Sequence, residues 1–352
     1  MSDSVDTILQ EDLLFEHFRL VVDQGQAPVR IDKYMSSHLE DTSRHRIQCA
    51  IKDGCVHVGD KVVKANYIVR PGDVLRFMMP YVRRGVDIVP QDIPLDIVYE
   101  DPDVLVVNKR AGMVVHPGHG NYDGTLVNAL AFYLHLPRQN AGASADERMG
   151  MLVHRIDKDT SGLLVVAKND AAQMHLASQF FVHSIERRYQ AVVWGNLAED
   201  EGTIESNIVR DPSDRLCFKS TDDPAKGKRA VTHYRVLERF GYVTLVECVL
   251  QTGRTHQIRV HMSSMGHPIF GDERYGGREI RKGTIYAKYR QFIQNCFEIC
   301  PRQALHAKTL GFEHPVTREW IQLDSRLPED MTALLEKWRR YCGQMPLEED
   351  EE

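Results

Sequence analysis

The sequence predicts an α+β protein in which a small α/β domain precedes a larger domain built on a mixed or antiparallel sheet. The chain has 352 residues, which is long for a single domain. Strand-like runs recur through residues 96–324 with few helical patterns between them. Residues 80–95 contain three prolines and show no period, so we interpret them as a linker between the two domains.

Both ends of the chain are acidic. Residues 1–16 carry five acidic side chains and no Lys or Arg, and residues 348–352 are all acidic. The net charge of −6 therefore conceals a mildly basic body. We expect solvated, disordered tails over residues 1–16 and 343–352. A basic body permits nucleic-acid binding without demonstrating it.

The composition excludes several protein classes. The 42% hydrophobic and 27% charged residues lie near globular averages, which argues against disorder and fibrous repeats. No apolar run approaches the ~20 residues that cross a bilayer, and the N-terminal residues lack the features of a secretory signal. The seven cysteines include no C-x-x-C pair, which indicates reduced thiols in the cytoplasm. Cys296 and Cys300, one helical turn apart, are only a weak metal signal.

Residues 17–79 are predicted to form the small N-terminal domain. Residues 30–51 have helical periodicity in two pieces, and the polar residues 41–43 between them supply oxygens that can cap the second helix. Residues 54–77 then alternate apolar and polar positions, interrupted by two Gly-containing turns. We expect a helix pair followed by short strands.

The N-terminal domain is also basic. Residues 29–79 hold nine Lys or Arg against six acidic residues. Arg44, Arg46 and Lys52 lie where the second predicted helix begins and ends, and they form a candidate phosphate-contacting face for RNA. A solvated helix surface would carry the same residues, and on charge alone that simpler interpretation is preferred.

Three motifs in this domain resemble the S4-type RNA-binding module. They are Ser43-Arg44 with Ile47, the G-x-V-x-V strand at residues 54–58, and the Gly72-Asp73 turn. The Asn-Gly that the module has after its strand is replaced by Gly59-Asp60. The resemblance implies that this domain adds affinity through phosphate and RNA-shape contacts and selects no particular base.

Residues 96–342 are predicted to form the larger domain. We expect two strands within residues 96–112 and further strands at residues 162–168, 189–195, 230–240, 242–250 and 319–324. Helical patterns cover residues 124–136, an insertion at 276–302 and a closing helix at 331–342. Residues 136–150 have the composition of a loop.

Residues 154–162 hold the most informative candidate for a catalytic group. Asp157 follows His154 and Arg155 and precedes a Thr-Ser-Gly turn and a strand. On its own, an Asp at such a turn is more often a structural element that pairs with a nearby Arg. A metal-dependent phosphotransferase loop built on Asp157 and Asp159 fits poorly, because that loop follows a buried apolar strand and here charged residues precede Asp157.

Residues 254–261 concentrate polar side chains, among them Arg254, His256, Gln257, Arg259 and His261. If this stretch is a strand, alternation places Arg259 on one face with Gln257 and His261. His256 and His261 are candidate metal ligands, but no cysteine or acidic partner has a suitable spacing nearby. We therefore expect no metal site here.

Together these segments resemble the RluA/RluD-type pseudouridine synthases. The family pattern H-R-L-D-x-x-T-S-G is matched by residues 154–162, the K/R-x-Y-x-A-x-V-x-G strand by residues around Tyr189, and G-R-T-H-Q-I-R-V-H by residues 253–261. Further family motifs match residues 108–112, 116–118, 124–130, 266–269, 271–272 and 305–307. Arg110, where the family has Pro, and Ile156, where it has Leu, are the departures.

The resemblance implies an enzyme that isomerises uridine to pseudouridine in RNA without a metal or redox cofactor. It implies Asp157 as the nucleophilic carboxylate, Arg259 as the cation that keeps it ionised, and Tyr189 as the aromatic ring that stacks on the uracil and relays a proton. It also implies that the uridine is everted from the RNA stack and that Arg155 fills the vacated position.

We therefore predict an RNA pseudouridine synthase, an isomerase with an S4-like N-terminal domain, that acts on large-subunit ribosomal RNA as a cytoplasmic monomer. Transfer RNA is the alternative substrate. A non-catalytic protein that binds structured RNA is the alternative class, and the presence of Asp157 argues against it. The predicted site residues are Asp157, Tyr189 and Arg259 for catalysis, and Arg155, Arg44, Arg46 and Lys52 for RNA binding.

Overall fold

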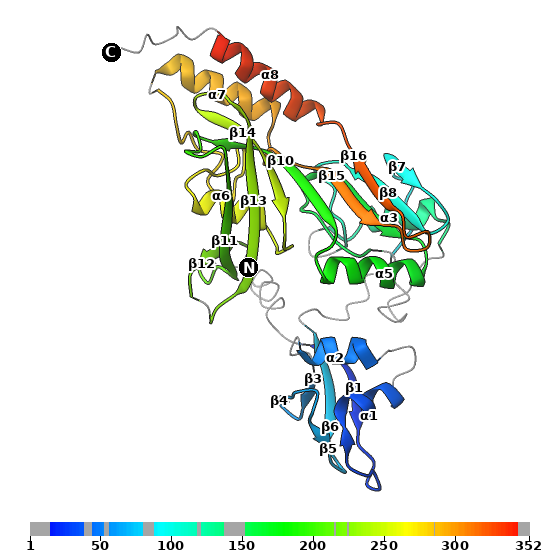
Figure 1. Cartoon of the computed structure of the whole chain (residues 1–352). Coiled ribbons are helices and arrows are strands. Elements are labelled where there is room, and N and C mark those ends of the chain that lie inside the picture. Colours follow the sequence, from blue (N-terminus) through cyan, green and yellow to red (C-terminus); the bar gives the residue numbers. More distant parts are fainter. Residues whose placement is uncertain are drawn as a thin grey trace, which may run out of the picture. The chain divides into compact units, whose positions relative to one another are not determined.

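The computed structural model describes residues 15–38, 44–52, 56–79, 88–117, 121–136, 152–214, 216–223, 225–284 and 286–343. The chain divides into two compact units, Met1–Gly85 and Val86–Glu352, and each unit has a hydrophobic core of its own (Figure 1). Most of the predicted acidic tails and nearly all of the predicted loop at residues 136–150 lie outside the described residues. No described helix combines the length and apolar character needed to cross a membrane.

The N-terminal unit combines two short helices with small antiparallel sheets. Its elements are β1 (Phe15–Val21), β2 (Val29–Arg30), α1 (Ile31–His38), α2 (Arg44–Lys52), β3 (Val56–Val58), β4 (Lys61–Val62), β5 (Ile68–Val69) and β6 (Val74–Met79). Four strands form a sheet in the order β1-β6-β3-β4, and β2 pairs with β5. The predicted helix pair and the strands that follow it are confirmed.

Strand β1 corrects the predicted extent of the N-terminal acidic tail. Phe15 and Glu16 pair with Met79 and Met78 of β6, so the last two residues assigned to the tail belong to the sheet. The tail was drawn from the count of acidic residues alone. A count of charges does not take account of the apolar residues in F-E-H-F-R-L-V, and that composition suits a strand.

The C-terminal unit is built on one sheet of ten strands. The strands follow the order β12-β11-β13-β14-β10-β15-β9-β8-β7, and β16 pairs with β15. Strands β9 and β15 are parallel, whereas the other neighbouring pairs are antiparallel, so the predicted mixed sheet is confirmed. The elements are β7 (Ile97–Glu100), β8 (Val104–Lys109), α3 (Leu126–Tyr133), β9 (Ser161–Ala167), α5 (Asp170–Phe181), β10 (Glu186–Trp194), β11 (Glu201–Arg210), β12 (Phe218–Thr221), β13 (Lys228–Arg239), β14 (Val243–Leu250), α6 (Gln257–Ser264), α7 (Ala287–Ile299), β15 (Leu305–Glu313), β16 (Trp320–Asp324) and α8 (Glu329–Gly343).

Both faces of this sheet are covered where β8 and β9 lie. In β8, Leu105 and Val107 pack into the core that includes residues of α3, α7 and α8, while Val104 and Val106 pack into a second core with α5. All four side chains are buried, as expected when alternate residues point to opposite faces that helices cover. Helix α5 packs on β9 and β15, and α7 packs beside α8 (Figure 1).

Residues 257–264 correct a second expectation. The stretch considered as a strand is helix α6, in which residues two apart point about 200° away from each other, so Arg259 does not share a face with Gln257 or His261. The sequence does not show the helical period here, because residues 257–262 are all buried and no exposed polar stripe marks the helix. The Gln257 side chain stabilises the first turn, since its Oε1 accepts hydrogen bonds from Thr252 Oγ1 and the Arg254 N–H.

The second half of the predicted linker packs on the C-terminal unit. Ile88 is buried against Val127 and Ala131 of α3. The side chain of Asn128 donates a hydrogen bond to the carbonyl of Val89 at 2.9 Å. Residues 88–95 therefore share the hydrophobic and polar contacts of the unit that they precede.

Candidate active site

Asp157 lies in a turn that leads directly into β9. Leu152 forms an isolated bridge to Val166 of β9, and the chain then turns so that the Thr160 N–H donates to the Asp157 carbonyl at 3.2 Å. The Asp157 side chain is 20% exposed. Its carboxylate is thus largely enclosed but reachable, as a group that meets a substrate must be.

Lys109, at the end of β8, holds this turn from one side. Its Nζ donates to the carbonyls of Lys158, Met113 and Arg110 at 3.0, 2.8 and 3.0 Å. Burial lowers the pKa of Lys109 to about 7, while three carbonyl acceptors match the three protons of its ammonium form. Arg110 contributes its backbone carbonyl to this arrangement, which a proline would also supply, while its side chain is exposed.

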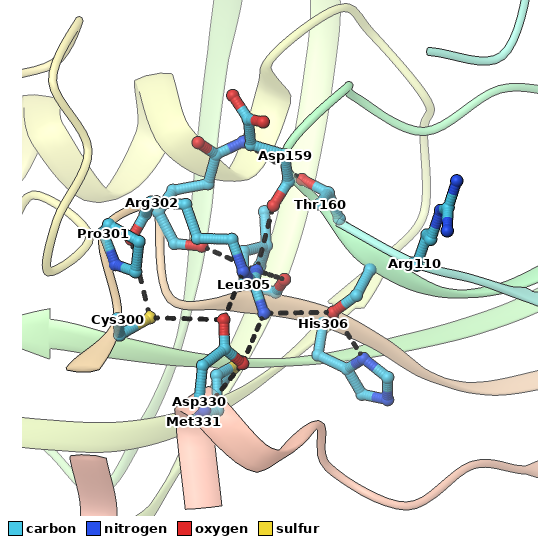
Figure 2. A network of polar contacts seen from close by, with 12 residues as sticks. Arg110, Asp159, Thr160, Cys300, Pro301, Arg302, Leu305, His306, Asp330 and Met331 are labelled. Carbon is cyan, nitrogen blue, oxygen red and sulfur yellow. Dashed lines mark hydrogen bonds and ion pairs between the residues drawn. The ribbon is translucent and has the colours of Figure 1, made fainter. Parts of the chain in front are cut away.

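Arg302, just before β15, holds the turn from the other side (Figure 2). Its Nη1 donates to the carbonyls of Asp159 and Leu305 at 2.9 and 3.2 Å. Its Nε and Nη2 donate to the two carboxylate oxygens of Asp330, the second residue of α8, at 2.7 and 2.9 Å. One side chain therefore ties the Asp157 turn to both β15 and α8.

Gly162 permits the close approach of β9 and β15 behind the turn. Its φ is +117°, a conformation that other residues rarely adopt, and a Cβ atom there would lie 2.2 Å from the Ala307 carbonyl oxygen. Next to it, Ser161 Oγ and His306 Nδ1 are 2.9 Å apart, and His306 Nε2 lies 2.8 Å from Ser325 Oγ. The Ser161 hydroxyl is thus used in structural hydrogen bonds next to the turn.

Arg259 of α6 meets Asp157 at 3.0 Å, measured from Nη1 to Oδ2. Its Nε and Nη2 donate to the two carboxylate oxygens of Asp272 at 2.7 and 2.9 Å. The Asp272 side chain is fully buried, and that of Arg259 is 6% exposed. A bidentate pair in a buried setting has a well-defined geometry, so Asp272 fixes the direction in which Arg259 faces Asp157.

The electrostatic balance favours the charged form of Arg259. Burial disfavours the guanidinium cation, but the hydrogen bonds and charges of Asp272 and Asp157 outweigh burial and raise the pKa of Arg259. The guanidinium carbon also lies 4.9 Å from the centre of the Tyr275 ring, a cation–π contact. Arg259 is therefore a permanent positive charge beside Asp157.

His256 is the third polar group around Asp157. Its Nε2 lies 3.9 Å from Asp157 Oδ1, and its Nδ1 is 2.7 Å from the Tyr275 hydroxyl. Burial lowers the pKa of His256 to about 4, so the ring is neutral at pH 7. His256 has a left-handed backbone conformation at the start of α6, with φ of +55°, and this conformation turns the chain into the helix.

Tyr189 lies on β10 between β14 and β15. It pairs with Cys248 and Ala307, and the register with β15 shifts at Arg188/Tyr189. The pairing skips Lys308 of β15, whereas the pairing of β10 with β14 is unbroken, so side chains along β10 still alternate between its two faces. Burial raises the pKa of Tyr189, while the nearby charges of Arg187 and Asp157 act on it in opposite directions. The phenol is thus protonated at neutral pH and within electrostatic reach of Asp157.

Arg155 and His154 differ in exposure although they are adjacent. Arg155 is exposed. His154 is held in the structure: its Nε2 accepts the Val165 N–H at 3.0 Å and its ring stacks on Phe180 at 4.5 Å. Burial lowers the pKa of His154 to about 3, so a neutral ring accepts this hydrogen bond, as expected of a structural residue.

The predicted RNA-contacting residues of α2 belong to the N-terminal unit. Arg44 donates to Asp32 Oδ2 from Nη2 at 2.9 Å, and its side chain remains 45% exposed. Asp32 is fully buried and also accepts from Arg30 and Gln48. Arg44 therefore has a structural role in joining α1 to α2. The side chains of Arg46 and Lys52 lie outside the described residues.

One group of potential metal ligands occurs in the described part of the chain. Ligand atoms of Asp101, Asp103 and His314 lie within 4.8 Å of one another. Asp101 Oδ2 already accepts from Tyr99 and lies 2.8 Å from His314 Nε2. Asp101 Oδ1 accepts the N–H groups of Asp103 and Val104. These hydrogen bonds satisfy the Asp101 carboxylate and give the group a structural role at the turn between β7 and β8.

Comparison with known proteins identifies the family. The family model for RNA pseudouridylate synthase matches residues 103–264, and the model for the S4 domain matches residues 29–75. An uncharacterized RNA pseudouridine synthase of Bacillus subtilis, YlyB, is 46% identical over 321 residues, which cover 91% of this chain and 98% of that protein. The chain belongs to the RNA pseudouridine synthase family.

Other relatives agree with this identification. The ribosomal large subunit pseudouridine synthase D of Zymomonas mobilis is 44% identical over 307 residues, which cover 87% of this chain and 92% of that protein. Among solved structures, human RNA pseudouridylate synthase domain containing 1 aligns with a TM-score of 0.50 at 26% identity and covers 74% of this chain and 98% of that one. The synthase is an isomerase that acts on RNA and carries an S4 domain, as predicted.

The structure also adds residues that the sequence did not single out for the site. Lys109 and Asp272 fall inside motifs of the pseudouridine synthase family, and that position was the available signal for them. Arg302 precedes the L-H-A motif by three residues, and nothing in the sequence linked it to the Asp157 turn. The synthase thus holds its candidate nucleophile with charged side chains from β8, α6 and the segment before β15.

Proposed function

We propose that this pseudouridine synthase modifies uridines of large-subunit ribosomal RNA with Asp157 as its nucleophilic group. The observation that supports this best is the arrangement of Asp157, Arg259 and Asp272. Arg259 is bound on one side by a buried carboxylate and presents Nη1 to Asp157 on the other. A carboxylate that is paired with a guanidinium, partly exposed and close to a buried aromatic ring suits a reaction on a single nucleotide.

The proposed reaction is redox neutral and exchanges one glycosidic bond for another. The N1–C1′ bond breaks, the base rotates, and a C5–C1′ bond forms. The proton on C5 is lost and N1 gains one, so no atom is added overall. The Asp157 carboxylate either attacks the nucleotide or stabilises the separated fragments, and both routes require its charged form.

Arg259 supports that charged form. An enclosed carboxylate tends to take up a proton, and a guanidinium 3.0 Å away opposes this tendency. Asp272 binds two of the three guanidinium nitrogens, so the Arg259 side chain cannot turn toward the substrate and remains paired with Asp157. We propose that Arg259 is an electrostatic partner of Asp157 throughout the reaction.

Tyr189 and Arg155 are proposed to act on the everted nucleotide. The buried Tyr189 ring offers an aromatic surface for the uracil, and its raised pKa keeps a proton available on the hydroxyl at neutral pH. Arg155 is exposed two residues before Asp157, where it can enter the RNA stack while the uridine occupies the site. Eversion of a base costs a few kcal/mol, which such a replacement offsets in part.

Ribosomal RNA is favoured as substrate by the relatives and by the domain organisation. Relatives from four bacteria that are 41–44% identical carry the name ribosomal large subunit pseudouridine synthase D. An S4 domain adds phosphate and shape contacts suited to a large folded RNA. We further propose that the enzyme works as a monomer in the cytoplasm, in line with the free cysteines that the structure describes.

The substrate is tested by mapping pseudouridines in total RNA from cells with and without the gene. Loss of pseudouridine at defined positions of large-subunit ribosomal RNA is expected. Loss confined to transfer RNA would contradict the proposed substrate while leaving the chemistry intact. Sedimentation of the purified protein at its working concentration tests the monomeric state.

The nucleophile is tested with Asp157→Asn, which keeps the shape of the side chain and removes its charge. We expect the rate of pseudouridine formation to fall more than about a thousandfold, while the affinity for RNA stays within about threefold of wild type. Asp159→Asn is the matched control, because it makes the same change in the same turn, and we expect activity close to wild type. Product formed by Asp157→Asn at the wild-type rate would refute the assignment.

A further inference from the structure

Arg187, on β10, is a buried cation that has no hydrogen-bond or ion-pair partner among the described residues. Its exposure is 7%, and its Nε has no hydrogen-bond partner. No ion pair with a described carboxylate accompanies it, and burial lowers its pKa. Burying an unpaired ion costs several kcal/mol, so a fold does not ordinarily keep one without a use.

The surroundings of Arg187 do not compensate its charge. Its guanidinium carbon lies 5.5 Å from the centre of the Phe180 ring, and that ring also stacks on the neutral His154. A cation–π contact stabilises a cation by less than burial destabilises it. Gly253 leaves room for the guanidinium, since a Cβ atom there would lie 2.6 Å from Nη1.

Arg254 is a second positive charge in this region, since it and Arg187 both act on His183. His183 is an exposed neighbour, and its pKa is lowered by burial and by the charges of Arg187 and Arg254. Arg254 donates only to the backbone carbonyl of Arg229 among the described residues and keeps its charge unpaired. The positive charges of Arg187 and Arg254, with the polar His183 in the field of both, attract anions.

Arg187 also lies next to the proposed reaction site. Residues 187 and 189 are both buried on β10, two positions apart and therefore on the same face of the strand. The charge of Arg187 reaches Tyr189, whose hydroxyl is likewise within reach of the Asp157 charge. An anion bound at Arg187 would therefore lie beside a nucleotide stacked on Tyr189.

We propose that the Arg187 guanidinium is the binding site for a phosphodiester group of the RNA strand next to the everted uridine. This inference rests on the proposed function, because it takes that strand as the ligand. A phosphodiester carries the full negative charge that the site lacks, and two of its oxygens can accept parallel hydrogen bonds from a guanidinium. A neutral uracil carbonyl would leave the buried charge uncompensated.

The salt dependence of RNA binding tests this proposal with the full-length enzyme and a ribosomal RNA fragment that contains a mapped target. Each phosphate contact contributes about 0.7–0.9 to the slope of log K against log salt concentration. We expect Arg187→Gln to weaken binding about tenfold and to reduce the slope by about 0.7–0.9, and Arg187→Lys to retain the wild-type slope. Arg188→Gln is the matched control, since Arg188 pairs with Glu186 and Glu247, and its slope should equal that of wild type.

Thermal unfolding separates a binding role from a structural one. Arg187→Gln and Arg187→Met both remove an unpaired buried charge that destabilises the folded protein. We therefore expect neither variant to lower the Tm. An unchanged slope in Arg187→Gln, with or without weaker binding, overturns the proposal and points to a base contact. A lowered Tm or failure to fold in both neutral variants also overturns it. A wild-type enzyme that binds RNA but forms no pseudouridine would refute the proposed function and leave the comparison of slopes valid.

Discussion

The three nitrogens of the Arg259 guanidinium are all committed to carboxylate oxygens. Two belong to the fully buried Asp272 and one faces Asp157. Ion pairs in such surroundings are little screened by solvent, so their geometry strongly affects the energy. Asp272 therefore acts through Arg259, and it determines where the positive charge stands without approaching a substrate itself.

A second residue-scale feature is the neutral His306, which predicts a pH dependence of stability. Burial, together with the charges of Arg302 and Lys308, lowers the pKa of His306 from 6.5 to about 4. Between these values the unfolded chain binds a proton that the folded protein does not, so the free energy of unfolding falls as the pH is lowered from 6.5 to 4. This group accounts for a loss on the order of 3 kcal/mol across that window.

Urea unfolding at a series of pH values checks the effect of His306. We expect the unfolding free energy of His306→Asn to decline less steeply between pH 6.5 and 4 than that of wild type. His233→Asn, at an exposed position of β13, should decline as wild type does. An identical decline in His306→Asn and wild type would show that His306 does not contribute.

At the scale of elements, the Asp157 turn depends on parts of the fold that follow it by more than 140 residues. The β9 strand that leaves the turn is parallel to β15 at Gly162 and Ala307. Arg302 precedes β15 and bridges the turn to Asp330 at the start of α8 (Figure 2). A helix near the C-terminal end of the chain thus restricts the position of the candidate nucleophile.

Substitution of Arg302 should reduce catalysis more than RNA binding. Arg302→Lys keeps a positive charge but cannot bind the Asp159 carbonyl and both Asp330 oxygens together. We expect kcat to fall about 10- to 100-fold because the turn is misplaced, while KM changes less than about threefold. Arg278→Lys is the control, since Arg278 is exposed and donates to the neighbouring Pro301 carbonyl. A rise in KM with unchanged kcat would contradict a positioning role for Arg302.

At the scale of the whole molecule, the S4 match and the candidate active site belong to separate units. The S4 match, residues 29–75, lies in the unit Met1–Gly85, and the residues around Asp157 lie in Val86–Glu352. Each unit has its own hydrophobic core, and in the N-terminal unit the buried Asp32 also accepts hydrogen bonds from Arg30, Arg44 and Gln48. Two independently packed units can contribute separately to affinity and to turnover.

Removal of residues 1–85 should therefore weaken RNA binding and leave the chemical step intact. We expect the Kd for ribosomal RNA to rise at least about tenfold, and the salt dependence to become shallower because phosphate contacts are lost. The single-turnover rate at saturating enzyme should stay within about threefold of that of the full chain. If the truncated enzyme binds RNA as tightly as the full chain, the S4 unit has another task.

The apolar periodicity of the sequence predicted the helices and strands whose buried residues recur at the period of that element. It missed the elements whose buried residues do not follow such a period. The pair α1 and α2 and the strands β8, β9, β13 and β14 follow their sequence periodicity. Helix α5 was not predicted, because it buries only Ala172, Leu176 and Gln179 and its apolar stripe is narrow. Helix α6 resembled a strand because its first six residues are all buried. Strand β15 was not predicted either, because some of its buried positions are polar, such as His306, and do not read as apolar positions of a strand.

The sequence by itself singled out Asp157, Tyr189 and Arg259 as the residues proposed for the chemistry, since the motifs that carry them are short and local. Only the tertiary structure decided how they meet. Arg259 reaches Asp157 across 102 residues, and Asp272 orients it from a separate turn. The unpaired charge of Arg187 likewise appears only once its neighbours in space are known. The physical reason is that such contacts depend on the order and register of distant strands, whereas periodicity records only how each segment buries its own face.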